Sequence, residues 1–490
     1  AIDDDQAEDR DSSRGDHDMT AGPMGFRSAH APGQQPRIAR TGPLTARQRL
    51  VQPDVMHMLP LVLLAYSTLI PPEVSVSIGD LSFYVYRVLL FAMIPLILRR
   101  AFLNFDRFNV WDLVILTSLL LIPVSLWANH SIAVALETGM SVTVDLGLSY
   151  FLARSSIRTT RDFQVFLVIL APGLAIAGLT MMAESLSSQL FVRPLMAEVF
   201  GGLDGLGRQN LYYRLGLLRA YGPFSHPILG GLHLAMFLAI YWYAVKNPVY
   251  RMMGMAAAAM CFFTLSSGPL LALVISAGLI FYNGLQRKID GLNWQHMFIV
   301  AILGLVIVEF GSENGIVSVV TRYLTFNSSS SWYRLAVWEF GTASVKANPL
   351  LGVGWNSWER ARWMVHETID AHFLWMAVRF GLPASLLLLG GSIAIMFKLG
   401  RRVSELPPSI ERDTRIGVLI ALFSLELMMF TVTLFGSTQI LFMLMLGAAA
   451  SLSATVFSIK RETVTSDEPP EAVSQAPAFA GKPPYVPSGA

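Results

Sequence analysis

Charged residues are scarce in this chain. They make up 14% of its 490 residues, against about 25% in an ordinary soluble domain, and 53% of the residues are hydrophobic. The mean hydropathy is +0.51. This composition excludes an ordinary soluble domain and predicts an all-α protein that crosses a membrane many times and is surrounded by membrane lipids. The net charge of +2 gives no indication of a nucleic-acid partner, and none is expected.

Cysteine is almost absent as well. The single Cys261 lies in an apolar run, where we interpret it as a small buried hydrophobic residue. One cysteine excludes an intramolecular disulfide and a thiolate metal cluster. The sequence also shows no sign of a glycine-rich nucleotide loop, a clustered carboxylate metal site or a GxSxG motif. We therefore expect no metal site and no cofactor.

The two ends of the chain have no apolar run. Residues 1–54 begin acidic (AIDDDQAEDRD) and become basic before the first apolar segment, so we expect a disordered cytoplasmic tail without a cleavable signal peptide. Residues 459–490 are rich in Pro, Ala and Ser and predict a second disordered cytoplasmic tail. The membrane domain is expected between them, over residues 55–458.

Apolar runs in that domain predict about 12 transmembrane helices, some shorter than the usual ~20 residues. The SSGP segment at Ser266–Pro269 predicts a turn between the seventh and the eighth. The expected spans are Val55–Ile70, Leu81–Leu98, Leu113–Trp127, Ile132–Leu152, Phe163–Met182, Pro227–Tyr243, Met252–Leu265, Pro269–Tyr282, Met297–Phe310, Phe373–Phe397, Ile416–Leu434 and Ile440–Phe457.

Lysine and arginine indicate the orientation of these spans. With the N-terminus in the cytoplasm, every inner connection contains Lys or Arg, whereas outer turns such as WANHS and FGST contain neither. This pattern predicts that both termini are cytoplasmic. Two long outer segments, 183–226 and 311–371, depart from it, because each contains four arginines. These arginines are Arg193, Arg208, Arg214, Arg219, Arg322, Arg334, Arg360 and Arg362.

Arginine in these outer segments suits an anionic ligand, since its planar fork matches phosphate. The alternative is that the arginines pair with acidic residues of the same segments. The acidic candidates for such pairing are Glu184, Glu198, Asp204, Glu359 and Glu367. We favour the ligand, because the apolar frame around both segments is poor in charge.

The second outer segment predicts an amphipathic helix on the outer membrane surface. NSSSS is a helix-start signal, Asn348-Pro349 a stop, and Gly352 and Gly354 then predict a tight turn. Three tryptophans follow, which we interpret as a belt at the membrane interface in preference to a sugar platform. The expected apolar face is Trp332, Leu335, Ala336 and Phe340, with Arg334 off it, and the three tryptophans are Trp355, Trp358 and Trp363.

Ionisable residues inside the spans are functional candidates. Arg87 and Glu137 have matching depths and predict a structural ion pair. Asp145 and Glu426 lie deeper and suit a proton path, which a lipid or solute transporter would need.

Three segments bear a resemblance to a known family. They are RAYGPFSHPILGG (Arg219–Gly231), SSWYRLAVWEFGTASVKANPLLGVGWNSW, with Arg334 and Trp338, and DAHFLWMAVRFGLPAS (Asp370–Ser385). Together they resemble motifs of the O-antigen ligase and O-antigen polymerase family of bacterial envelope glycosyltransferases. The resemblance covers about residues 55–458, and its motifs are specific only in combination. It implies an inner-membrane enzyme whose donor is a glycan on a polyprenyl diphosphate and whose acceptor is a glycan or a lipid A core.

The resemblance also implies roles for individual residues. Arg219 and Arg334 would stabilise the leaving diphosphate, with Arg214 and His226 as further binding residues. For the base, the family spacing leads to Asp370, with Ala371 where the family has Asn, while histidine chemistry favours His372 over the weaker candidate His366. We expect His372 to be the base and Asp370 to orient it. A lone histidine at a helix mouth, as His226 and His372 are, is otherwise an ordinary interface residue.

Overall fold

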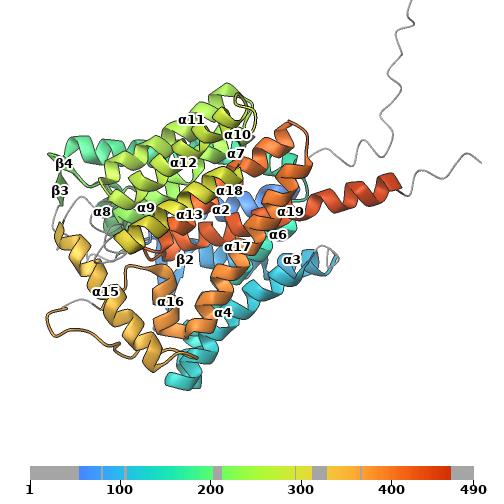
Figure 1. The fold of residues 1–490 in the computed structure, drawn as a ribbon. Helices are drawn as coiled ribbons and strands as arrows, with labels where there is room; N and C mark the ends of the chain where they lie inside the picture. The colour runs from blue at the N-terminus through green and yellow to red at the C-terminus, as the bar shows by residue number, and fades with distance from the viewer. Residues whose placement is uncertain are drawn as a thin grey trace, which may run out of the picture. The chain divides into compact units, whose positions relative to one another are not determined.

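The computed structural model describes residues 55–78, 81–103, 108–201, 212–292, 294–311, 328–364 and 367–464. The expected N-terminal tail lies outside these residues. The described part is mostly helical (Figure 1). Seven of its helical segments are long and apolar enough to cross a membrane. The chain therefore has the architecture of a helical membrane protein. The seven segments are Val110–Asn129, Ile132–Ser156, Thr160–Ser187, Pro227–Ala244, Ser267–Gln286, Leu382–Glu405 and Gly436–Ala454.

Helices and two small hairpins follow one another along the chain. The first part contains α2 (Val55–Ser67), β1 (Ser75–Ile78), β2 (Leu81–Tyr84), α3 (Val85–Leu103), α4 (Val110–Asn129), α5 (Ile132–Val134), the π-helix η2 (Ala135–Gly139), α6 (Met140–Ser156), α7 (Thr160–Ser187), α8 (Val192–Phe200), β3 (Tyr213–Arg214) and β4 (Leu217–Leu218). The second contains α9 (Pro227–Ala235), α10 (Phe237–Ala244), α11 (Pro248–Ala259), the 3₁₀ helix η3 (Met260–Thr264), α12 (Ser267–Gln286), α13 (Trp294–Gly311), α15 (Ser328–Ala347), α16 (His372–Phe380), α17 (Leu382–Glu405), α18 (Ile410–Met429) and α19 (Gly436–Val464).

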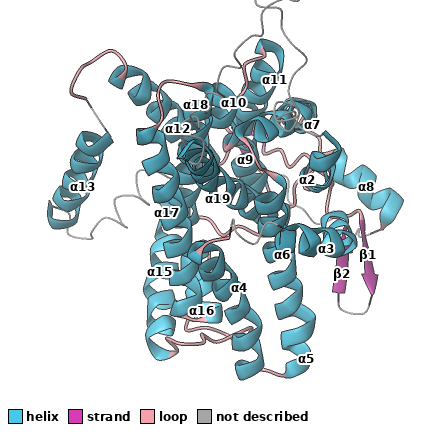
Figure 2. Ribbon diagram, turned by 90° about the vertical axis from the view of Figure 1, so that its right-hand side faces the viewer, coloured by secondary structure: helices cyan, strands magenta, loops and turns pink. Residues whose placement is uncertain are grey.

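Helix α19 lies at the centre of the packing. It contacts α6, α9, α17 and α18, and nearly every side chain from Ile440 to Ser453 is buried. Figure 2 shows it surrounded by these helices. It also continues to Val464, past the expected end of the membrane domain at residue 458.

Every apolar run predicted as a span overlaps a helix, although the number of crossings stays a prediction. The predicted turn between the seventh and eighth runs is confirmed, since Leu265 adopts a left-handed conformation with φ 47° and Ser266 is extended. The predicted start of the second run was wrong. Residues Leu81–Tyr84 form a strand that pairs with Ser75–Ile78, where serine alternates with the β-branched Val76 and Ile78, a pattern that favours a strand over a helix.

The predicted Arg87–Glu137 ion pair was wrong. Arg87 donates from Nη2 to Asp145 Oδ2 at 2.6 Å, and from Nη1 to the Ser82 carbonyl at 2.6 Å. Glu137 lies in the π-helical turn η2 and is exposed. Asp145 is the nearer partner because α3 packs directly on α6. This pairing accounts for the buried charge of Asp145, which therefore no longer indicates a proton path.

A break between α16 and α17 shapes the end of the fold that carries α15. Gly381 has φ 93° and ψ 158°, a conformation that is essentially restricted to glycine. Because the helix is interrupted at Gly381, the main chain there can bond to the segment that follows α15. The Leu382 N–H donates to the Pro349 carbonyl at 2.8 Å. A β-carbon at Gly381 would lie 2.0 Å from the Leu350 carbonyl oxygen. Gly381 and Pro383, inside the expected span Phe373–Phe397, predict a kink, and the structure has a full interruption of the helix there.

The turn at Gly352 and Gly354 is confirmed, since both have positive φ, 61° and 57°. The N–H of Gly354 donates to the Arg379 carbonyl at 2.9 Å, and the Arg379 side chain donates from Nη1 to the carbonyls of Gly354 and Asn356 at 3.0 and 2.7 Å. Arg379, an ionisable residue within an expected span, therefore has a structural role that accounts for its burial.

Gly381→Ala should destabilise the protein. The strained backbone alone costs about 1–3 kcal/mol, and the added methyl group collides with the Leu350 carbonyl. We expect a lower thermal midpoint and a lower yield of monodisperse protein. Gly390→Ala in α17 is the matched control, because nothing lies within 4 Å of a β-carbon there. Equal stability of the two variants would contradict the role of the break.

Candidate functional site

Helix α15 is the element that brings the candidate site together. It begins in the serine run and ends before Asn348-Pro349, as predicted. Its inward row is Val337, Gly341 and Ser344, all buried, because the helix packs against α16 (Figure 2). This packed row differs from the expected apolar face of Trp332, Leu335, Ala336 and Phe340, whose contact with a membrane surface stays a prediction. Trp332 is 59% exposed, whereas Arg334, one turn before Val337, lines a pocket on the packed side.

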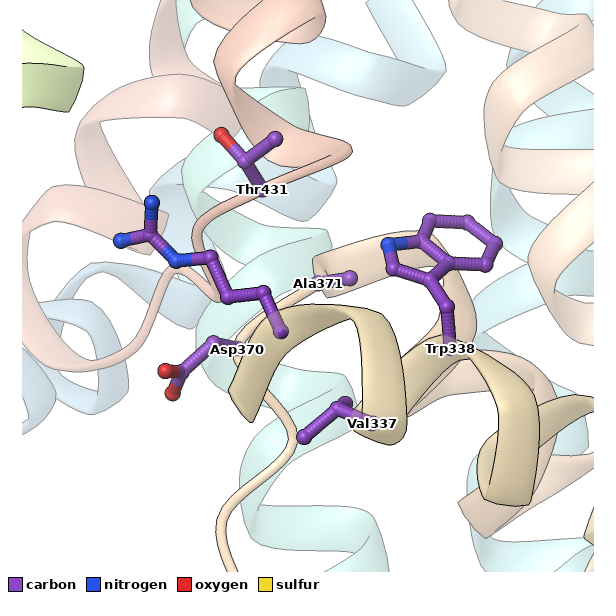
Figure 3. A pocket seen from close by; sticks show the side chains of 6 residues that line it. Val337, Trp338, Asp370, Ala371 and Thr431 are labelled. Carbon is purple, nitrogen blue, oxygen red and sulfur yellow. The ribbon is translucent and has the colours of Figure 1, made fainter. Parts of the chain in front are cut away.

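That pocket joins three segments that are far apart in the sequence (Figure 3). Arg334, Val337 and Trp338 come from α15, Asp370 and Ala371 from the residues before α16, and Thr431 from the turn after α18. Burial lowers the pKa of Arg334, and the carboxylate of Asp370 opposes this shift. The pocket therefore holds one basic and one acidic group that interact electrostatically.

The position of Asp370 is set by its neighbours. The preceding Ile369 is 3% exposed and its carbonyl accepts a hydrogen bond from Thr433 Oγ1 at 2.5 Å. The following Ala371 is 2% exposed and its carbonyl accepts from Trp375 N–H at 2.7 Å, in the first turn of α16. The main chain on both sides of Asp370 is thus anchored, while its own side chain remains half-buried at the pocket.

His372 lies elsewhere. It is 0% exposed, its ring stacks on Trp375 with centroids 5.6 Å apart, and neither ring nitrogen has a hydrogen-bond partner among the described residues. Burial lowers its pKa from 6.5 to about 3. His372 therefore donates no hydrogen bond to Asp370, and the expected orientation of His372 by Asp370 is not found. Helix α16 begins at His372 and turns this side chain into the core, away from the residue two positions before it. His366 lies outside the described residues.

Two further predicted arginines come from the β3–β4 hairpin and the residue after it. Arg214 donates from Nη1 to the Leu265 carbonyl at 3.0 Å. Arg219 donates from Nε to the Thr264 carbonyl at 3.2 Å and from Nη2 to Ser266 Oγ at 2.8 Å. Both side chains are thus anchored to the turn between η3 and α12 by hydrogen bonds to uncharged acceptors.

These arginines also influence one another. Burial lowers the pKa of Arg219 to about 10, and the charge of Arg214 contributes to the shift. Arg214 likewise lowers the pKa of Arg334, after burial. The hairpin and α15 therefore place Arg214, Arg219 and Arg334 within electrostatic range, Arg214 being the member that interacts with both others.

His226 is the N-cap residue of α9 and lies within electrostatic range of Arg219. Its Nδ1 accepts a hydrogen bond from Ile228 N–H at 3.2 Å, which leaves Nε2 to bear the proton of the neutral ring. Burial lowers its pKa to about 4, and Arg219 and Arg193 contribute. At neutral pH His226 is therefore an uncharged group whose Nε2–H is a hydrogen-bond donor.

Among the described acidic residues of these segments, Asp370 alone acts electrostatically on the three arginines, and it acts on Arg334. Glu184 is 0% exposed and its carboxylate accepts only backbone N–H groups. Arg193 pairs with Glu73 at 2.5 Å, and Arg360 pairs with Glu367. Among the described residues, Arg214, Arg219 and Arg334 form no ion pair. The N–H groups that Glu184 accepts from belong to Phe191, Val192, Tyr221 and Gly222.

Sequence reasoning missed the structural roles of Glu73 and Glu184. Glu184 was considered only as a partner for arginine, although a carboxylate at the end of a long apolar helix is equally suited to cap the loops that follow it. The burial of Glu184 between two loops could not be inferred from its position in the chain.

No protein-family model matches this chain, and no curated protein matches it.

His372→Phe should make the stability of the protein less sensitive to acid. Between pH values of about 3 and 6.5 the unfolded chain binds a proton at His372 that the folded chain does not bind. The free energy of unfolding therefore rises with pH across this window, and phenylalanine abolishes that contribution. We expect the thermal midpoint to fall less in the variant than in the wild type between about pH 7.5 and about pH 5. An equal fall in both proteins would show that His372 is accessible to protons in the folded state.

Proposed function

We propose that this protein is a glycosyltransferase of the bacterial inner membrane. It transfers or polymerises a glycan that is linked to a polyprenyl diphosphate, at the periplasmic face, and the acceptor is a glycan or a lipid A core. The O-antigen ligase and polymerase family is the one that its three motifs resemble, and the proposal extends that resemblance to the positions described above.

The observation that supports the proposal best is the group formed by Arg214, Arg219 and Arg334. Three partly buried guanidinium groups interact electrostatically without an ion pair among the described residues, and burial lowers the pKa of each. Such an arrangement has an energetic cost, because desolvation and mutual repulsion both oppose the charges. A diphosphate offsets that cost by accepting charge-assisted hydrogen bonds from the arginine forks.

The chemistry assigns separate tasks to the basic and acidic groups. The acceptor hydroxyl gives its proton to the Asp370 carboxylate as its oxygen forms a bond to the anomeric carbon. The bond between that carbon and the diphosphate oxygen breaks, and the electron pair leaves with the diphosphate. Arg219 and Arg334 stabilise the leaving charge, while His226 Nε2–H donates a hydrogen bond to it. A direct displacement of this kind inverts the anomeric configuration.

Asp370 replaces His372 as the proposed base for a physical reason. It lines the pocket with Arg334, whereas His372 is fully enclosed and stacked on Trp375. A base must reach the proton it removes, so geometry takes precedence over the more convenient unperturbed pKa of histidine.

The proposed topology has about 12 transmembrane helices with both termini in the cytoplasm. Segments 183–226 and 311–371 then face the periplasm. The asymmetry of Lys and Arg supports this orientation. The gathering of arginines from both segments agrees with it, because segments that build one site must lie on one side of the membrane.

Arg219→Ala and Arg334→Ala should each reduce glycan transfer about 100-fold or more, the cost typical of removing a preorganised charge-stabilising donor. Lysine at either position should restore only part of the activity, because it lacks the bidentate fork. The measurement is transfer from a polyprenyl-diphosphate glycan in membranes with matched protein levels. Arg362→Ala is the control, an exposed arginine of the same outer segment. Full activity of both alanine variants would refute the diphosphate role.

Asp370→Asn should lower the transfer rate about 100- to 10,000-fold, as expected for the loss of a general base. His372→Phe should keep most of the activity, since the ring is buried and phenylalanine preserves its stacking on Trp375. Rates of both variants, measured against pH, test the assignment. An inactive His372→Phe together with an active Asp370→Asn would return the role of base to His372.

A second candidate function is a transporter of lipids or solutes. It is favoured by Glu426 on α18, which is 5% exposed and has one carboxylate oxygen without a partner among the described residues. Deleting the gene and analysing the surface glycan separates the candidates. Loss of long polymer, or of polymer attachment, supports a transferase, whereas intact polymer on the wrong face of the membrane supports a transporter.

A further inference from the structure

The aromatic residues of the outer segment do not form one belt. Trp358 is 3% exposed and donates from Nε1 to the Glu367 carbonyl at 3.1 Å, so it belongs to the core beneath α15. Trp355 packs edge-on against Phe380 and lies under the Arg379 guanidinium. These two tryptophans are structural, and each holds a part of the loop in place.

Trp332 and Trp363 are different. Their ring centroids lie 4.4 Å apart, with 31° between the planes, although the residues come from α15 and from the loop after it. They remain 59% and 45% exposed. Tyr333 extends the pair, with its ring edge toward Trp363 at 6.4 Å between centroids. We name these three residues the aromatic platform.

The platform continues into the site described above. Tyr333 directly precedes Arg334 on α15, and its phenol lies within electrostatic range of Asp370 and Arg360 and is hydrogen-bonded to the Thr368 side chain. An apolar ring surface is thus bordered by two hydroxyl groups and a carboxylate. A pyranose ring offers the matching surfaces, a face of C–H groups and a rim of hydroxyls.

Charge near the platform argues against a lipid occupant. Arg360 is ion-paired with Glu367 and also donates to the Met364 carbonyl, one residue from Trp363. The Glu367 side chain is 54% exposed. Inserting the platform into acyl chains would dehydrate this ion pair, which is costly. A hydrated sugar chain leaves it in water.

We propose that Trp332, Trp363 and Tyr333 form a carbohydrate subsite that binds a pyranose of the glycan next to the Arg334–Asp370 pocket. This inference rests on the proposed function and adds to it a site for the sugar itself, separate from the diphosphate site. The platform would hold the chain that enters or leaves the reaction, and so influence which glycan is accepted.

The test uses the full-length protein in detergent micelles and a lipid-free probe, the oligosaccharide released from the cells' own surface glycan by mild acid. Saturation-transfer NMR reports contact between aromatic side chains and sugar C–H groups. The double variant Trp332→Ala/Trp363→Ala should bind about tenfold more weakly and raise the apparent KM for the glycan, with kcat little changed. Trp332→Phe/Trp363→Phe keeps both ring faces and should retain most of the binding.

Trp127→Ala on α4 is the matched control, because Trp127 is 61% exposed and lies on a membrane-crossing helix. It should leave sugar binding unchanged. Size-exclusion profiles and thermal midpoints establish that each variant is folded. If the alanine variant does not fold, the phenylalanine pair is compared with Trp332→Leu/Trp363→Leu, which keeps apolar bulk without a ring face.

The other outcomes are distinguishable. A folded platform variant that binds the probe and transfers glycan as the wild type does would overturn the subsite and leave the proposed function standing. Quenching of the Trp332 and Trp363 fluorescence by brominated phospholipid, taken as wild type minus double variant in nanodiscs, would identify a membrane anchor instead. A wild-type protein that neither transfers glycan nor binds the probe would overturn the proposed function together with the subsite.

Discussion

The contact between the Pro349–Asn356 turn and the break at Gly381 determines how the region around α15 and α16 is organised. Leu382 N–H reaches the Pro349 carbonyl, and the Arg379 guanidinium holds the carbonyls of Gly354 and Asn356. These bonds fix the end of α15 relative to the junction between α16 and α17. Because Arg334 lies on the one helix and Asp370 just before the other, the pocket between them depends on a contact that involves neither residue.

The arginines impose a second constraint. Arg214 and Arg219 donate to carbonyls and a hydroxyl around Leu265, and this neutral support holds their positions without cancelling their charge. Glu184, from the same segment as Arg214 and Arg219, accepts hydrogen bonds from backbone N–H groups, and Glu73, from a distant segment, pairs with Arg193. Asp370 compensates only Arg334, so the cluster as a whole is unfavourable by itself, which is why we propose an anionic ligand for it.

For His372, the chemistry of the residue and its position in the fold favour different roles. Its ordinary pKa makes it the more convenient base at neutral pH, but the start of α16 turns it onto Trp375, where burial keeps it neutral. Asp370, a weaker base in water, remains at the pocket because it precedes the helix. Position also decides between tryptophans of the same chemistry. Trp358 is buried in the core, whereas Trp332 and Trp363 contact each other at the surface.

The sequence by itself determined the features that depend on local chemistry. Apolar runs located the helices, the serine run and Asn348-Pro349 bounded α15, and Gly352, Gly354 and Gly381 marked the turn and the break. Periodicity and backbone preference act over a few residues, so they can be inferred from the chain alone. Only the tertiary structure decided that Arg87 meets Asp145, that Glu184 caps two loops, and that Arg334 faces Asp370 while His372 is enclosed. These outcomes depend on which helices pack together and how each is rotated about its axis, and side chains far apart in sequence contribute to that choice jointly.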